Sequence, residues 1–175
     1  QMIHRDVWGP AHNDTAGGSK YFVSFTDDYS CCSAIYLMTL KSEVLDKFKE
    51  FEAAVTAETG ERIGVLRTDN GGKYVSKEFK NFLKLKGIQH QTTVPHTPEQ
   101  NGVAERLNRT LVEKARTMLV HAGVPLNLWG EAVVTANYLK NRLPTRSLKG
   151  NLTPYEVWCG RKPDVSNLRV FGCIA

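Results

Sequence analysis

Segments with strand and helix character alternate along the first half of the chain, and their order limits the folds that it can adopt. β-Branched and aromatic residues predict an antiparallel meander of three strands at residues 3–8, 20–25 and 33–40, with a turn at residues 26–28. Next come a helix capped by Ser42 and ended by Gly60, a strand at 62–68, a helix capped by Ser76 and ended by Gly87, and a strand at 88–94. The order βββαβαβ predicts an α/β domain with a five-stranded mixed sheet flanked by helices.

The second half of the chain is mainly helical in character. Apolar residues three and four apart predict a long helix from near Asn101 to a stop at Gly123, followed by a helix capped by Asn127 that runs through Tyr138. The tetrad Thr-Pro-Tyr-Glu at residues 153–156 is a capping box with proline at the first helical position, which predicts a short helix to Cys159. We therefore divide the chain into a core over residues 1–142 and an extension over residues 143–175, which we expect to be truncated.

The positive charge of the chain is concentrated at its end. The net charge of +5 lies within residues 140–175, which hold seven basic and two acidic residues, whereas residues 1–139 hold sixteen of each. A basic stretch of this kind indicates a polyanionic partner, although a solvated lysine-rich surface has the same composition. No run of 18 apolar residues is present, so we expect no membrane segment, and no Cys/His spacing suits zinc, so we expect buried, reduced thiols.

Three acidic residues on three predicted elements indicate a metal site. Asp69 ends a strand before the turn sequence Asn-Gly-Gly, and Asp6 lies in the first strand. Glu105, separated from Asp69 by 35 residues, lies in the first turns of the long helix. Each acid alone has a structural explanation. Asp69 can serve as a turn residue, Asp6 can pair with Arg5 or Arg67, and Glu105 can complement the helix dipole. Together, three carboxylates within ~6 Å would repel one another unless a cation neutralised them. Oxygen ligands without His or Cys favour Mg²⁺ or Mn²⁺ over zinc.

The same residues resemble a known family. The segments Ile-His-Arg-Asp-Val-Trp-Gly-Pro around Asp6, Arg-Thr-Asp-Asn-Gly-Gly around Asp69 and Thr-Pro-Glu-Gln-Asn-Gly-Val-Ala-Glu-Arg around Glu105 resemble the catalytic core of copia-type LTR retrotransposon integrases, within the retroviral-type DDE superfamily. Residues 25–30, 153–156 and 168–173 also resemble that family, so the likeness covers nearly the whole chain. It implies an RNase H-like fold. Lys73 and Cys31 depart from the family's usual residues.

The resemblance also implies an activity, that of a polynucleotidyl transferase with endonuclease and strand-transfer functions. Asp6, Asp69 and Glu105 would bind two Mg²⁺ ions about 3.5–4 Å apart when DNA is bound, and Mn²⁺ would substitute. The nucleophile would be water during 3′-end processing and the 3′-hydroxyl of the element during joining to target DNA. The partners implied are DNA, namely element ends and target, and a second copy of the chain, with a higher oligomer in the full-length protein and no membrane. The implied location is intracellular, in cytoplasmic virus-like particles and the nucleus.

Candidate DNA contacts lie beside the third acid. Arg109 is one helical turn beyond Glu105, and we group it with Arg106, Asn108, Gln100 and Asn101 as residues that hold the element end. Alternatively, Arg109 pairs within the helix with Glu105 or Glu113.

Two other functions remain open on the sequence alone. One is a catalytically silent, domesticated module for DNA binding or assembly, and the other is an RNase H-type nuclease.

Overall fold

A five-stranded mixed sheet forms the centre of the molecule. The computed structural model describes residues 1–69, 76–92 and 102–173. The strand order is β3-β2-β1-β4-β5, with antiparallel pairing of β1–β2 and β2–β3 and parallel pairing of β1–β4 and β4–β5. The strands are β1 (Met2–Trp8), β2 (Tyr21–Asp27), β3 (Ser33–Met38), β4 (Val65–Thr68) and β5 (Gln89–Thr92). The predicted meander and mixed sheet are confirmed.

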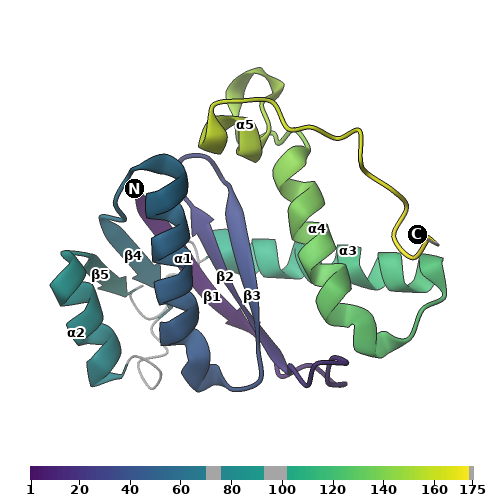
Figure 1. Ribbon diagram of the computed structural model, residues 1–175, viewed down its shortest axis with the longest axis horizontal. Helices are drawn as coiled ribbons and strands as arrows, with labels where there is room; N and C mark the ends of the chain where they lie inside the picture. Colours follow the sequence, from purple (N-terminus) through teal and green to yellow (C-terminus); the bar gives the residue numbers. More distant parts are fainter. Residues whose placement is uncertain (70–75, 93–101, 174–175) are drawn as a thin grey trace.

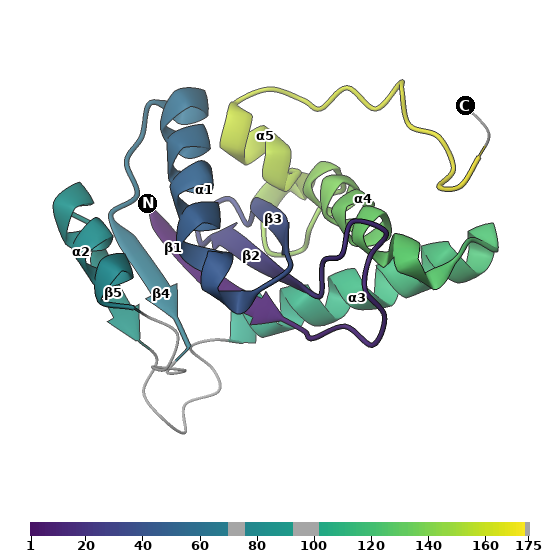
Figure 2. The ribbon, with the colours of Figure 1, turned by 60° about the horizontal axis from the view of Figure 1, so that its bottom comes forward.

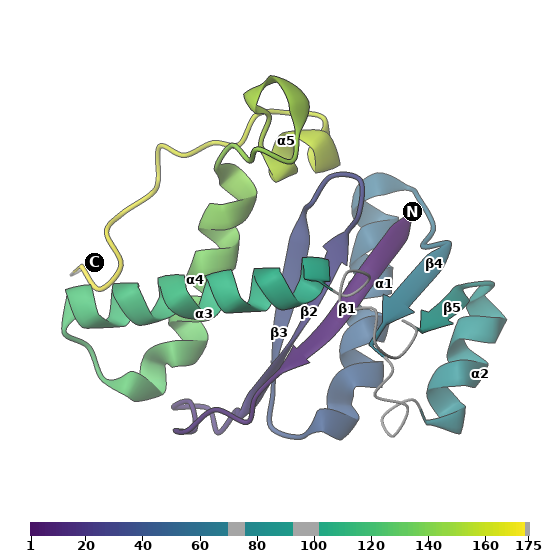
Figure 3. The same ribbon diagram turned by 180° about the vertical axis from the view of Figure 1, so that it is seen from behind.

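Helices cover both faces of this sheet. Helices α1 (Val44–Thr59) and α2 (Lys77–Lys86) lie on one face, and α3 (Gly102–Ala122) crosses the other face, as Figures 1 and 3 show from opposite sides. Helix α4 (Trp129–Arg142) packs on α3 and on the edge strand β3, and the short α5 (Pro154–Cys159) lies between the ends of α1 and α4. Single 3₁₀ turns occur at η1 (Lys41–Glu43), η3 (Leu126–Leu128) and η4 (Lys149–Asn151). None of the helices in these described ranges is both long and apolar enough to span a membrane.

Two apolar cores, one on each face, fix the helices to the sheet. Strand residues alternate between them, so Ile3 and Val7 of β1 belong to the core under α1 and α2, whereas Trp8 packs into the core under α3 and α4. The first core is aromatic, with the rings of Phe25 and Phe51 stacked at 4.7 Å between centroids. This alternation matters for function because it sends neighbouring residues of β1 to opposite faces.

Several predicted element boundaries are wrong by a few residues. Strand β2 continues to Asp27, into the predicted turn, and β4 begins only at Val65, although the backbone of Gly64 already bonds Gln1 and Gln89. Ser42 caps no helix: it lies inside η1, where Glu43 accepts backbone hydrogen bonds from residues 39 and 40 instead. Asn127 likewise lies inside η3, and α4 runs four residues past the predicted end at Tyr138. The expected buried thiols are only half-buried at Cys31 and Cys32, and Cys159 and Cys173 are exposed.

The signals with a specific backbone requirement are confirmed. Ser76 Oγ accepts the Phe79 N–H at 3.1 Å at the start of α2, and the capping box of α5 is formed by Thr153 and Glu156. Gly60, Gly87 and Gly123 all adopt the left-handed conformation after their helices. The end of the predicted strand at 88–94 and the start of the predicted helix near Asn101 lie outside the described residues.

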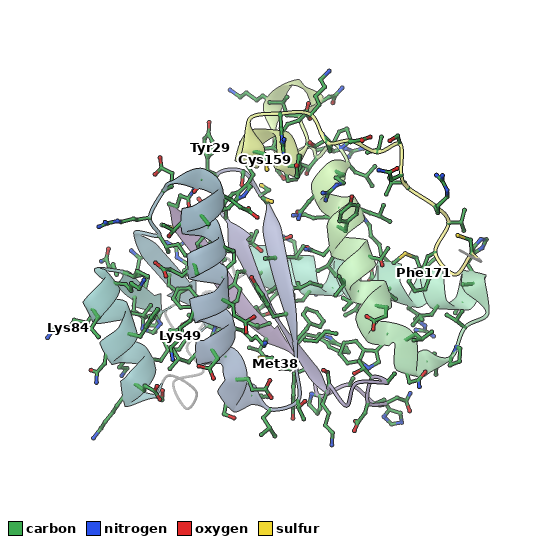
Figure 4. All side chains as sticks on the ribbon, viewed as in Figure 1. Tyr29, Met38, Lys49, Lys84, Cys159 and Phe171 are labelled. Carbon is green, nitrogen blue, oxygen red and sulfur yellow. The ribbon has the colours of Figure 1, made fainter. Side chains whose placement is uncertain are left out.

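The chain after α5 returns across α4 to the far end of α3, as Figures 1 and 2 show. Its residues are mostly exposed until Phe171, which packs against the core of α3 and α4 and lies near the C-terminal end of α3 in Figure 4. Gly172 then approaches α3 with φ +83°, and a Cβ there would lie 2.5 Å from the Cβ of Ala122. This pair of residues therefore anchors the tail to the long helix.

Gly172→Ala is expected to detach this anchor, because the added methyl group clashes with Ala122 and the left-handed backbone disfavours alanine. We expect a lower melting temperature and faster limited proteolysis within residues 160–170. Gly150→Ala is the matched control, since Gly150 has φ +78° but no heavy atom within 4 Å of a Cβ. Equal losses in the two variants would show that the contact with Ala122 contributes nothing.

Candidate active site

The first two predicted acids lie next to each other where the pairing of β1 with β4 ends. The last paired residues are Arg5 and Thr68, so Asp6, which still lies within β1, and Asp69, which directly follows β4, are neighbours. The turn sequence after Asp69 predicted this position at the end of the strand. Both carboxylates line a small cavity of about 70 Å³. The sequence-based expectation that the first and fourth strands are neighbours is confirmed.

Helix α3 brings the third acid to the other side of Asp6. Glu105 lies exposed in the first turn of α3, and Asn108, one turn later, is buried and donates from Nδ2 to Oδ2 of Asp6 at 2.9 Å. The other oxygen of Asp6, Oδ1, accepts the Val7 backbone N–H at 2.9 Å. These two bonds fix the orientation of the Asp6 carboxylate between β4 and α3.

The Asp6 carboxyl is electrostatically strained. Burial raises its pKa to about 6, and the neighbouring carboxylates of Asp69 and Glu105 raise it as well, against the lowering effects of the Val7 N–H and Arg5. The ionised form of Asp6 is thus disfavoured by the negative charges of both other acids. Perturbation by burial together with specific charged neighbours is typical of functional sites.

The three acids are not drawn into one closed cluster. Across residues 1–69, 76–92 and 102–173, no three His, Cys, Asp or Glu side chains are close enough to hold a metal ion together. Asp69 instead turns to Arg5, whose Nη2 lies 3.4 Å from its Oδ1. Mutual repulsion explains this arrangement, because each carboxylate is favoured next to a donor or cation rather than next to another carboxylate.

An open groove of about 420 Å³ extends from Asp6 along α3. Its walls include Glu105, Asn108 and Arg109, and it continues past Val112 to Glu113. Within the described part of the chain, Arg109 makes no ion pair with Glu105 or Glu113, which does not support the intrahelical alternative. The groove combines two of the predicted acids with an exposed cation.

The other predicted DNA contacts have different environments. Arg106 is exposed on α3 beside Glu105, whereas Asn108 is buried, with its amide directed to Asp6. Gln100 and Asn101 lie outside the described residues. The bond from Asn108 to Asp6 is a contact that the sequence analysis missed, although the spacing of Asn108 three residues after Glu105 places it on the same helical face.

Two of the seven basic residues near the end of the chain are used in packing. Lys140 donates to the Cys31 carbonyl, and the guanidinium of Arg142 lies over the rings of Tyr138 and Tyr155, at 3.4 and 4.7 Å from their centroids. The remaining five are exposed, and they are Arg146, Lys149, Arg161, Lys162 and Arg169. The proposed division of the chain at residues 142 and 143 stays a prediction.

Comparison with known proteins identifies the family. Residues 1–98 match the family model described as the integrase core domain, a span that includes Asp6 and Asp69. The chain belongs to the integrase core family. Glu105 lies beyond that match, but it is included in alignments to relatives that span 98–99% of the chain.

The curated relatives are polyproteins of retrotransposons. The chain is 47% identical over 174 residues to the retrovirus-related Pol polyprotein from transposon TNT 1-94 of Nicotiana tabacum, and 39% identical over 173 residues to that from transposon RE2 of Arabidopsis thaliana. It is 32% identical to the Ty1-LR3 Gag-Pol polyprotein of Saccharomyces cerevisiae. The chain spans only 10–13% of the length of these relatives. The predicted kinship with copia-type retrotransposon integrase cores is confirmed.

Solved integrase structures share the fold. A chain of the simian T-cell lymphotropic virus intasome in complex with the PP2A regulatory subunit B56 gamma matches 99% of this integrase core with a TM-score of 0.70 and 18% identity, over 64% of its own length. The HTLV-2 integrase catalytic core domain in complex with magnesium matches 89% with a TM-score of 0.64 and 19% identity, over 94% of its own length. The RNase H-like fold is therefore confirmed.

Proposed function

We propose that this integrase core catalyses Mg²⁺-dependent 3′-end processing and strand transfer of retrotransposon DNA into target DNA. The observation that carries the proposal is the position of Asp6, oriented by Asn108 and Val7 and flanked by Asp69 and Glu105. The family membership supports the same reaction class. The HTLV-2 core that shares the fold was solved with magnesium, which supports Mg²⁺ as the cofactor here.

The residues present fit a hard divalent cation. Asp6 is an oxygen donor whose ionised form is disfavoured by burial and by two neighbouring carboxylates, so a cation would relieve the unfavourable charge. Asp6, Asp69 and Glu105 would hold it, as two ions when DNA is bound, and Mn²⁺ would substitute because it accepts the same oxygen ligands. When bound, these ions supply positive charge that lowers the barrier to attack on a phosphodiester.

The remaining residues position the acids and the DNA. Asn108 and the Val7 N–H hold Asp6 so that its carboxylate cannot rotate freely. Arg106 and Arg109 are exposed next to Glu105 and would bind backbone phosphates of the element end, with Gln100 and Asn101 on the preceding segment. The oxygen of water or of a DNA 3′-hydroxyl gives up its proton and forms the new bond to phosphorus, while the bond from phosphorus to the displaced DNA oxygen breaks and that oxygen takes up a proton.

Arg109→Ala is expected to weaken binding of an element-end duplex by roughly 3- to 10-fold and to reduce the salt dependence of binding by about one phosphate contact. The reason is that Arg109 is exposed in the groove that contains Asp6 and Glu105. Fluorescence anisotropy at several salt concentrations measures both effects. Arg62→Ala, which removes an exposed charge just before β4, is the control. If the salt dependence of DNA binding is the same in Arg109→Ala as in the wild type, Arg109 does not contact DNA phosphates.

The proposed partners are element-end DNA, target DNA and further copies of the chain. The related simian virus protein was solved in an intasome and the HTLV-2 core in dimeric and trimeric forms, which supports a homodimer of this core and a higher oligomer of the full protein. The exposed basic residues after Arg142 supply charge for a polyanion. We propose cytoplasmic virus-like particles and the nucleus as the sites of action.

A strand-joining assay tests this function directly. The chain is incubated with a labelled element-end duplex, target duplex and Mg²⁺ or Mn²⁺, together with a branched substrate on which joining can run in reverse. We expect metal-dependent cleavage or reversal of joining on the branched substrate and weaker joining of paired ends. Binding without turnover in Mn²⁺ would indicate a silent assembly module, and preferred cleavage of the RNA strand of a hybrid would indicate an RNase H-type nuclease.

A further inference from the structure

Arg5 has an environment that packing alone does not explain. Its side chain is only 4% exposed, yet it lies directly before Asp6 on β1, at the edge of the acidic site. Its Nη2 lies 3.4 Å from Oδ1 of Asp69, and its Nε and Nη1 are buried without a hydrogen-bond partner. A guanidinium carries five N–H donors, so most of the donor capacity of Arg5 is unused within the described structure.

A buried and poorly satisfied guanidinium destabilises a fold unless charge compensates it. An apolar side chain of similar size at such a position is commonly neutral or stabilising, because it avoids the desolvation of the charge. Among the described residues, Asp69 and Asp6 are the carboxylates close enough to interact with the Arg5 charge. Arg5 also lines the 70 Å³ cavity together with both of these carboxylates, Lys41 and Val44. The charge of Arg5 therefore interacts with the two acids and contributes nothing to the packing of the apolar core.

We propose that Arg5 is an internal counter-ion of the acidic site, which holds Asp69 and competes with the divalent cation for it. This inference rests on the proposed metal-dependent function and names the residue that regulates cation affinity. The Asp69 oxygen that faces Arg5 must turn away or be shared before it can bind a cation. The positive charge of Arg5 also repels the cation, and solvent screens this repulsion only weakly because Arg5 is buried. Arg5 thus weakens cation binding and stabilises the site before a cation binds.

Arg5→Met tests the proposal, since methionine fills similar space without charge. Binding of Mn²⁺ to the DNA-free protein is measured by isothermal titration calorimetry and by the metal-induced rise in melting temperature. We expect roughly tenfold tighter binding than in the wild type, because repulsion of this size acts between close charges in a partly buried site. Arg5→Gln, which is also neutral, is expected to shift affinity in the same direction and replaces Arg5→Met should the latter not fold.

Arg67→Met is the matched control. Arg67 lies on the neighbouring strand β4, is half-buried and bonds Gln91 at 3.0 Å instead of an acid. We expect its loss to change Mn²⁺ affinity less than threefold. Equal gains in the two methionine variants would mean that general charge, not Arg5, sets the affinity, and an unchanged or weaker affinity in both Arg5 variants would overturn the proposal.

A double-mutant cycle without metal tests the same contact independently. Asp69→Asn is expected to lower the melting temperature in the Arg5 protein and to leave it unchanged or raise it in the Arg5→Met background. Additive effects would contradict the counter-ion role. If neither the wild type nor any variant binds Mn²⁺ while the cycle shows coupling, the metal site of the proposed function fails but the Arg5–Asp69 contact does not. Wild-type Mn²⁺ binding with no response to Arg5 substitution rejects only this inference.

Discussion

Asp69→Asn and Glu105→Gln are each expected to reduce metal-dependent strand joining by roughly 1,000-fold or more, while the fold stays intact. Each change removes one anionic oxygen ligand and leaves the side-chain shape almost unchanged, so the loss falls on cation binding and hence on stabilisation of charge at phosphorus. Both side chains are substantially exposed, so the fold stays intact in each variant, and Asp69→Asn loses only the small contribution of its contact with Arg5. The measurement is product formation per active molecule, with circular dichroism and melting temperature as checks on folding.

Glu131→Gln is the matched control for Glu105→Gln. Glu131 is also exposed and also lies in the first turn of a helix, α4, but it lines neither of the two cavities that contain Asp6. Its replacement is expected to keep activity within about threefold of the wild type. Retained activity in Asp69→Asn or Glu105→Gln would remove these acids from the reaction.

Asp6→Asn is expected to stabilise the metal-free protein at pH 7 by about 2 kcal/mol, while it abolishes activity. The pKa of Asp6 is raised to about 6, so the ionised carboxylate destabilises the fold at pH 7 by about 3 kcal/mol relative to an ordinary aspartate. Asparagine removes this destabilisation but loses about 1 kcal/mol of hydrogen bonding, because it has only one acceptor oxygen for the bonds from Val7 and Asn108. A chain of this size then melts about 4–8 °C higher. Stability given up for activity is typical of active sites.

The pH dependence follows from the direction of the shift. A carboxyl with a higher pKa in the folded chain binds its proton more tightly when folded, so its contribution to stability is lost as the pH rises from about 4 to about 6. The advantage of Asp6→Asn is therefore absent below pH 4 and complete above pH 6. Mn²⁺ reverses the order at pH 7, since it stabilises only the protein that binds it. An advantage that does not vary with pH would show that the Asp6 charge is not the cause.

The sequence predicted those parts of the fold that depend on local chemistry. Ser76, the capping box at Thr153 and the glycines after the helices each satisfy a requirement of one backbone turn, and the structure confirms them. Ser42 and Asn127 have the same cap-forming side chains, but 3₁₀ turns precede α1 and α4 and move the helix starts beyond them. A competing short turn of this kind has no clear signal in the sequence.

The position of the acids was predictable, whereas their partners were not. Strand and helix patterns placed Asp6 within the first strand, Asp69 at the end of the fourth strand and Glu105 in the first turns of a helix, and parallel pairing of β1 with β4 brings the first two together. The side chains that hold them depend on tertiary packing. Arg5 was considered only as a partner of Asp6, yet it bonds Asp69, and Asn108 was assigned to DNA, yet it bonds Asp6.

Anomalous diffraction from a crystal of the wild-type core soaked in Mn²⁺ would locate the cation relative to the three acids. We predict a manganese peak bonded to carboxylate oxygens of Asp6 and Asp69, with Asp69 turned from Arg5, and Glu105 joining a second ion when DNA is bound. Manganese bound only elsewhere on the protein, with the Arg5–Asp69 bond unchanged at saturating Mn²⁺, would contradict this prediction.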